Sequence, residues 1–141
     1  MRRFVCLLAG VLLVVPSLGS DDPKGYDGAV VWDDALQGEW RHVGYMLNGN
    51  VIKEEGGVWT YRNGKETISQ DGRQLSERRY VVHPSSRLGR MDCVETSGKT
   101  WRSIYRIEGD NLLMSSGPLG GERPRSLEDK NLWVFVFKRV K

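Results

Sequence analysis

The chain has 141 residues, with 21 Lys and Arg against 18 Asp and Glu, and a formal net charge of +3. This length suits one domain and leaves too little chain for two. Residues 1–19 have the features of a targeting segment and include Arg2 and Arg3, so without them the net charge falls to +1. An excess this small produces no field that would attract a polyanion. We therefore expect no nucleic-acid partner.

Residues 1–19 have the three parts of a secretory signal peptide. A pair of arginines supplies the positive start, an apolar run follows over 4–15, and the small residues Ser17 and Gly19 precede the expected cleavage point. A membrane anchor is the alternative, but this run spans about 18 Å of a hydrocarbon core about 30 Å thick, and Pro16 interrupts it. We therefore expect export to the periplasm or the cell exterior, and no membrane span after cleavage.

The expected mature chain begins with a polar leader. Residues 20–28 are rich in Asp and Gly, and apolar residues three to four apart over 30–36 predict a short helical turn. Residues 20–35 are therefore expected to precede the domain itself. Cys6 leaves with the signal peptide, so Cys93 is the remaining thiol and an internal disulfide is excluded.

From Glu39 onward, short runs of strand-forming residues alternate with turn residues. Two-residue turns such as Asn63-Gly64 favour antiparallel hairpins, because Asn and Gly accept a positive φ. A long meander of hairpins closes on itself, since closure removes its exposed edges. The fold class expected for 36–141 is therefore all-β, an up-and-down antiparallel barrel of about eight strands. The expected strands span 39–47, 58–62, 65–69, 74–82, 90–96, 100–107, 112–116 and 132–139.

Period-two alternation predicts which side chains face the inside of this barrel. Trp101 and Tyr105 share one face of their expected strand, and Trp40 and Met46 share one face of the first. The last expected strand is apolar on both faces, so its outer side needs a cover. Either the helical turn or the long loop before this strand would provide that cover.

The expected interior leaves two functions open. A barrel of about eight strands is either filled by its own side chains or just wide enough for one small ligand. In the first case the domain is a structural or protein-interaction module with no small ligand. In the second it binds a small, partly apolar molecule. The residues then expected to line the ligand site are Met46, Trp59, Trp101, Tyr105 and Met114.

Five short patterns occur in order along the expected domain. They are L-Q-G-x-W at 36–40, Asn48-Gly49, Y-R-I-E-G-D-N-L at 105–112, Arg123-Pro124 and F-K-R at 137–139. In these the chain resembles an uncharacterised lipocalin-like domain family of planctomycetes, whose members are typically exported. The resemblance covers 36–141 and implies a lipocalin-like β-barrel with no established activity. It also implies that Trp40 closes one end of the barrel and that Arg139 lies across its ring, a structural pair that contributes about 0.5–2 kcal/mol.

The sequence contains no combination of residues that indicates catalysis or metal binding. His42 and His83 lack a partner at the spacing of metal ligands, and no histidine is placed beside Cys93. We expect His42 to be buried and hydrogen-bonded to a neighbour, and Cys93 to be a small core residue. Arg78 and Arg79 follow Glu77 directly, which predicts a mixed charged surface. We therefore expect no enzymatic activity, no cofactor and no metal.

Overall fold

The computed structural model describes residues 32–85 and 87–141, which contain nine β-strands and no α-helix. The expected signal peptide, the polar leader and the first residues of the expected helical turn lie outside this part of the chain. Within it, the Asp33 carbonyl accepts the backbone N–H groups of Leu36 and Gln37 and forms a single turn. No helix of the described residues is long and apolar enough to cross a membrane.

The strands are β1 (Gly38–Leu47), β2 (Asn50–Lys53), β3 (Val58–Arg62), β4 (Lys65–Gln70), β5 (Arg73–His83), β6 (Gly89–Val94), β7 (Thr100–Glu108), β8 (Asn111–Ser116) and β9 (Val134–Arg139).

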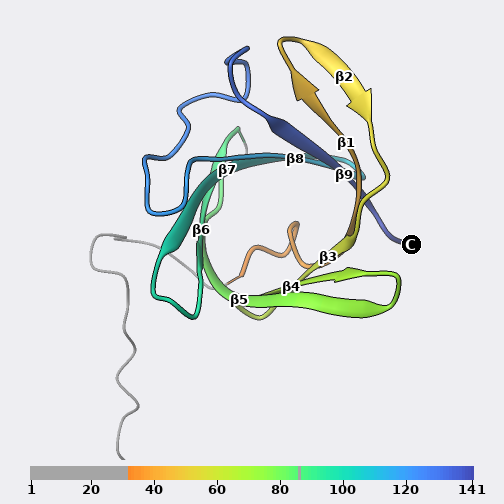
Figure 1. Ribbon diagram of the computed structural model, residues 1–141, viewed down its shortest axis with the longest axis vertical. Helices are drawn as coiled ribbons and strands as arrows, with labels where there is room; N and C mark the ends of the chain where they lie inside the picture. Colours follow the sequence, from red (N-terminus) through yellow and green to blue (C-terminus); the bar gives the residue numbers. More distant parts are fainter. Residues whose placement is uncertain (1–31, 86) are drawn as a thin grey trace, which may run out of the picture.

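The strands form a closed antiparallel barrel. Neighbours follow chain order from β3 to β9, and β1 pairs with both β3 and β9. The β1–β9 pairing closes the ring that Figure 1 shows from one end. Closure removes the unpaired edges that an open sheet of β1 and β3 to β9 would expose. The expected all-β, up-and-down barrel is confirmed.

Tight turns join several of these strands, as the sequence predicts. Asn63 and Gly64 have φ angles of 51° and 78°, and Asp71 and Gly72 have 51° and 74°. Positive φ at both central residues is the turn geometry whose twist matches two antiparallel strands. Asn, Asp and Gly are the residues that accept this geometry with the least strain. The local chemistry of these turns therefore explains the meander.

Strand β2 is not among the expected strands. β1 pairs with β3 through its first residues, from Gly38 to Arg41, and with β2 through its last, from Gly44 to Leu47. β1 is therefore longer than the barrel wall, and the β1–β2 hairpin projects from the ring in Figure 1. All of β2 is exposed. A strand without a buried face has no apolar alternation, so the sequence pattern does not reveal it.

A β-bulge turns part of β1 over. The pairing of β1 with β9 shifts register between His42 and Gly44, so the side chains after the bulge change faces. Gly44 has a φ of 153°, and a Cβ on it would collide with the Ile52 carbonyl oxygen. Met46 therefore packs in a cluster on the outer side of the barrel. The prediction that Met46 shares an inner face with Trp40 is wrong, because strict alternation cannot include a bulge.

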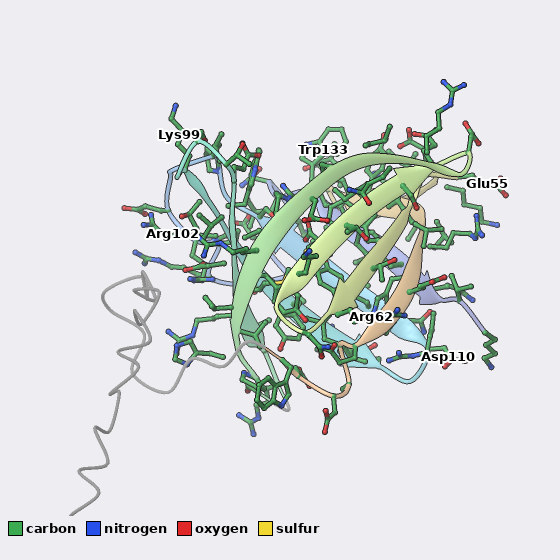
Figure 2. All side chains as sticks on the ribbon, turned by 90° about the horizontal axis from the view of Figure 1, so that it is seen from below. Glu55, Arg62, Lys99, Arg102, Asp110 and Trp133 are labelled. Atoms are coloured by element: carbon green, nitrogen blue, oxygen red, sulfur yellow. The ribbon has the colours of Figure 1, made fainter. Side chains whose placement is uncertain are left out.

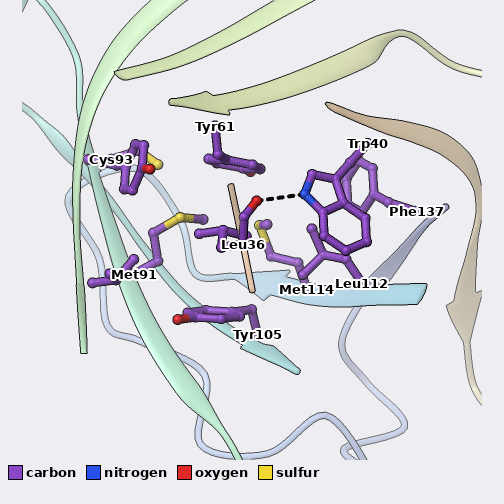
Figure 3. Close-up of a cluster of buried hydrophobic side chains, with 11 residues drawn as sticks. Leu36, Trp40, Tyr61, Met91, Cys93, Tyr105, Leu112, Met114 and Phe137 are labelled. Atoms are coloured by element: carbon purple, nitrogen blue, oxygen red, sulfur yellow. Dashed lines mark hydrogen bonds between the residues drawn. The ribbon is translucent and has the colours of Figure 1, made fainter. Parts of the chain in front are cut away.

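Apolar side chains fill one half of the barrel. Leu36 lies before the first strand but is fully buried among them, as Figure 3 shows. The Trp40 indole Nε1–H donates a hydrogen bond to the Leu36 carbonyl at 2.8 Å. The turn before β1 therefore plugs the barrel and satisfies the buried indole. The buried cluster consists of Leu36, Trp40, Tyr61, Tyr80, Val82, Met91, Cys93, Tyr105, Leu112, Met114 and Phe137.

The loop between β8 and β9 covers the outer side of the last strand. Leu127 from this loop is 6% exposed and packs with Ile104 and Val134. Arg123, from the same loop, donates to Asp92 Oδ1 at 2.6 Å and to backbone carbonyls of β6 and β7. Asp92 is itself buried, so this ion pair fixes the loop to the wall. The long loop, one of the two covers considered, therefore contacts the outer apolar face.

Candidate functional site

One end of the barrel is sealed by the turn that precedes β1. Asp33 Oδ2 accepts a hydrogen bond from the Tyr105 hydroxyl at 2.7 Å, and Gln37 Nε2 donates to the Tyr80 hydroxyl at 2.8 Å. The Gln37 side chain also accepts the backbone N–H of Asn63, in the β3–β4 turn. These bonds come from three sides of the barrel, so they hold the turn across this end. We call it the sealed end.

The opposite end, which we call the open end, carries the β4–β5 and β6–β7 turns and the start of β9. Figure 2 shows Lys99 and Trp133 toward this end, and Arg62 and Asp110 toward the sealed end. Trp133 is 48% exposed and stacks on Tyr45, with ring centroids 4.5 Å apart. The rim of the open end therefore presents a large aromatic surface to solvent.

Three aromatic side chains inside the open end come from different strands. Trp59 on β3, Trp101 on β7 and Phe135 on β9 are only partly buried, and they pack against the filled core. His42 on β1 joins them, with its ring centroid 5.7 Å from that of Phe135. Flat apolar faces that are neither fully buried nor fully exposed are typical of small-molecule sites.

A buried charged cluster lies beside these rings. The Glu66 carboxylate is 1% exposed, and Glu66 Oε1 accepts a hydrogen bond from Arg78 Nε at 2.7 Å. Cys93 Sγ donates to the other carboxylate oxygen at 3.2 Å. Burial and the nearby Glu66 raise the pKa of the Cys93 thiol well above its ordinary value of 9.0. Burial and the raised pKa keep this thiol protonated at neutral pH, so it is a poor nucleophile.

Arg78 and Glu95 connect the cluster to the open end. Arg78 Cζ lies 6.0 Å from the centroid of the Trp59 ring. Glu95 Oε1 accepts the Trp101 indole N–H at 2.6 Å and lies 3.9 Å from Arg78 Nη1. Each tryptophan is thus oriented by a charged neighbour. Aromatic faces fixed in this way need little ordering when a ligand arrives.

A cleft of about 390 Å³ opens through the wall beside this cluster. Pairing of β5 with β6 stops at Arg79 and Val94, so the β4–β5 and β6–β7 hairpins diverge beyond that pair. Arg78 and Glu95 belong both to the cleft and to the inner cluster, so the cleft leads from solvent to the charged groups. Its lining consists of Lys65, Glu77, Arg78, Arg79, Val94, Glu95, Thr96 and Gly98.

Two of the buried polar atoms on the inner face that have no hydrogen-bond partner within the described residues lie toward the open end. They are His42 Nε2 and Ser76 Oγ. The prediction that a neighbour bonds His42 is therefore not met at Nε2, and the ring instead packs against Phe135 and Phe137. An unpaired buried polar group costs about 1–3 kcal/mol. A polar group of a bound molecule would recover that cost.

The five side chains expected to line a ligand site fall into three places. Trp59 and Trp101 lie inside the open end. Tyr105 and Met114 are 2% and 1% exposed and belong to the filled half. Met46 lies outside the wall. Of the expected set, two tryptophans thus remain at the open end.

Trp40 and Arg139, the pair that the resemblance places at the closure, are in contact. Arg139 Cζ lies 4.1 Å from the centroid of the Trp40 ring, and the two residues face each other across β1 and β9. The guanidinium also donates to the carbonyls of Gln37 at 2.8 Å and Ala35 at 2.6 Å. It therefore joins the first strand, the last strand and the sealing turn at one point.

The charged members of the site were not identified from the sequence. The predicted mixed surface is wrong for Arg78, which faces Glu66 across β4 and β5. The alternation of side chains along β5 does place Arg78 on the same face as Tyr80 and Val82. This alternation was the signal in the sequence that could have identified Arg78 as an inner residue. The adjacent Arg79, which is exposed, suggested solvent for both.

Among the residues that the structure describes, no three His, Cys, Asp or Glu side chains are grouped so that they could hold a metal ion.

Comparison with known protein families, with curated proteins and with solved structures gave no match. The function is therefore inferred from the geometry of the open end itself.

Proposed function

We propose that this chain is an exported lipocalin-like protein of the planctomycete family that it resembles. We further propose that its barrel binds a small, partly apolar molecule at the open end and catalyses no reaction. The contrast between the two ends carries this proposal. The sealed half is filled by buried side chains, whereas Trp59, Trp101 and Phe135 keep accessible faces at the open end.

The chemistry of the open end supports a ligand with two kinds of surface. An apolar part would lie against Trp59, Trp101 and Phe135, where removal of apolar area from water contributes about 25 cal/mol per Å². A polar part would bond to His42 Nε2 and Ser76 Oγ, which lack partners in the described residues. Few, well-placed polar groups within an apolar site are the usual basis of ligand specificity.

A fluorescence titration tests this proposal. N-phenyl-1-naphthylamine, an uncharged apolar dye, should bind the exported protein saturably and with one-to-one stoichiometry. Ser76→Phe adds a ring to the inner face of the open end, so it should weaken binding at least tenfold. Leu75→Phe is the matched control, because the preceding side chain along β5 is 61% exposed, and it should leave the affinity within twofold.

A filled barrel that acts as a structural or protein-interaction module is the second candidate. The filled half supports it, as do exposed apolar side chains such as Val51 at 66% and Trp133 at 48%. If the protein is folded by circular dichroism but binds neither the dye nor other apolar probes saturably, this second candidate replaces the first.

Export has its own test. Mass spectrometry of protein recovered outside the cytoplasm should give the mass expected for cleavage after Gly19. Recovery of an exported form that still carries residues 1–19 would contradict cleavage and favour a retained anchor.

A further inference from the structure

A second cavity lies on the outer side of the barrel wall, beneath the loop between β8 and β9. Its volume is about 270 Å³. None of its lining residues belongs to the open-end site, so the two are separated by the wall itself. The lining consists of Met46, Asn48, Gly49, Arg106, Leu113, Leu127, Glu128, Asp129, Lys130, Leu132 and Val134.

Apolar side chains form the walls of this cavity. Val134 and Leu127 are almost fully buried, and Met46 and Leu113 pack against them. The bulge in β1 contributes directly, because it turns Met46 away from the barrel interior and toward this space. A space lined mainly by apolar surface offers water few hydrogen-bond partners, so it favours an apolar occupant.

The loop over the cavity is fixed at several points. The backbone N–H of Asn48 donates to the Lys130 carbonyl at 3.0 Å, and Arg106 Nη1 donates to Glu128 Oε1 at 3.0 Å. Leu127 anchors the same segment in the outer apolar cluster. The cavity is therefore formed before a ligand arrives, which lowers the cost of binding.

The charges around the cavity balance. The lining contains Arg106 and Lys130 as well as Glu128 and Asp129, so neither sign of charge is in excess. An ionic head group would therefore gain no net attraction there. An apolar cavity of about 150 Å³ is already large enough for benzene, and pockets for larger drug-sized ligands begin near 300 Å³. We propose that this cavity is a second binding site, for a small uncharged apolar molecule such as a substituted benzene.

A methyl NMR titration with toluene tests this second site. The methyl signals of Leu113, Leu127 and Val134 should shift saturably, whereas those of Met91 and Met114, inside the barrel, should not. Leu113→Phe places a larger side chain in the cavity and should weaken toluene binding at least tenfold. Circular dichroism shows whether this variant folds, and the methyl map of the unaltered protein decides the question by itself if it does not.

Ser76→Phe separates this proposal from the one for the open end. It narrows the barrel interior and should leave the toluene shifts at Leu113 and Val134 unchanged. Shifts confined to Met91 and Met114 would overturn the outer site while supporting entry into the barrel. The outer site is equally overturned if no lining methyl shifts up to the solubility of toluene, or if Leu113→Phe binds toluene as tightly as the unaltered protein.

Discussion

Trp40→Ala is the substitution that most directly probes how the barrel is closed. The indole is fully buried, donates to the Leu36 carbonyl at 2.8 Å and lies beneath Arg139. Its removal therefore affects three things together: core packing, the bond that holds the sealing turn, and the contact between the first and last strands.

The magnitude follows from these contacts. Truncation of a buried aromatic side chain costs about 3–5 kcal/mol, and the lost indole hydrogen bond adds about 1 kcal/mol. We expect Trp40→Ala to lower the free energy of unfolding by about 4–6 kcal/mol. The total free energy of unfolding of a native protein is about 5–15 kcal/mol, so this loss is a large part of it. Arg139→Ala keeps the core intact and loses the ring contact and two bonds to carbonyls, so we expect about 1–3 kcal/mol.

Urea unfolding followed by circular dichroism measures these differences. Lys138→Ala is the matched control, because this side chain is exposed on the other face of β9, and it should change stability by less than about 0.5 kcal/mol. A double-mutant cycle of Trp40→Phe with Arg139→Ala should give a coupling of about 0.5 kcal/mol or more. If Trp40→Ala unfolds at the same urea concentration as the unaltered protein, the closure argument is refuted.

Three further predictions concern the loop, the pH dependence and the thiol. Arg123→Ala leaves the buried Asp92 carboxylate unpaired, so it should lower the free energy of unfolding in urea by about 3–5 kcal/mol. Arg125 is exposed, so Arg125→Ala should leave that free energy almost unchanged, and equal losses for the two variants would contradict the anchoring role of Arg123. Burial raises the pKa of Tyr105 above its ordinary value of 10.0, so its contribution to stability is complete below that pH and is lost as the pH rises further. The urea midpoint should therefore stay level between about pH 8 and pH 9 and fall between about pH 10 and pH 11, and an unchanged midpoint over the second interval would count against this. Cys93 should resist iodoacetamide at about pH 8 in the folded protein, because burial raises the pKa of its thiol, and it should react once the protein is unfolded in urea. Rapid modification of the folded form would contradict this, because it would show that the thiol is accessible.

The strands and turns were predictable because their determinants are local. Alternating side chains and an Asn-Gly or Asp-Gly pair act over a few residues, so the β3–β4 turn at Asn63-Gly64 and most strand bounds could be read from the sequence. Burial of Cys93 was also predicted, since a lone thiol in an apolar strand is usually a core residue. The exposed β2 was missed, because it has no buried face to produce a pattern.

The position of the candidate site was decided by tertiary structure. Alternation assumes a regular strand, and the bulge after His42, which depends on how β1 curves against β9, moved Met46 out of the barrel. Glu66 and Arg78 became one buried pair because β4 and β5 align them, and single-strand patterns contain no information about that register. The sequence by itself determined the strands other than β2 and most of their inward faces. Which end of the barrel is sealed depended on where the turn at Leu36 packs, a long-range contact that no local pattern encodes.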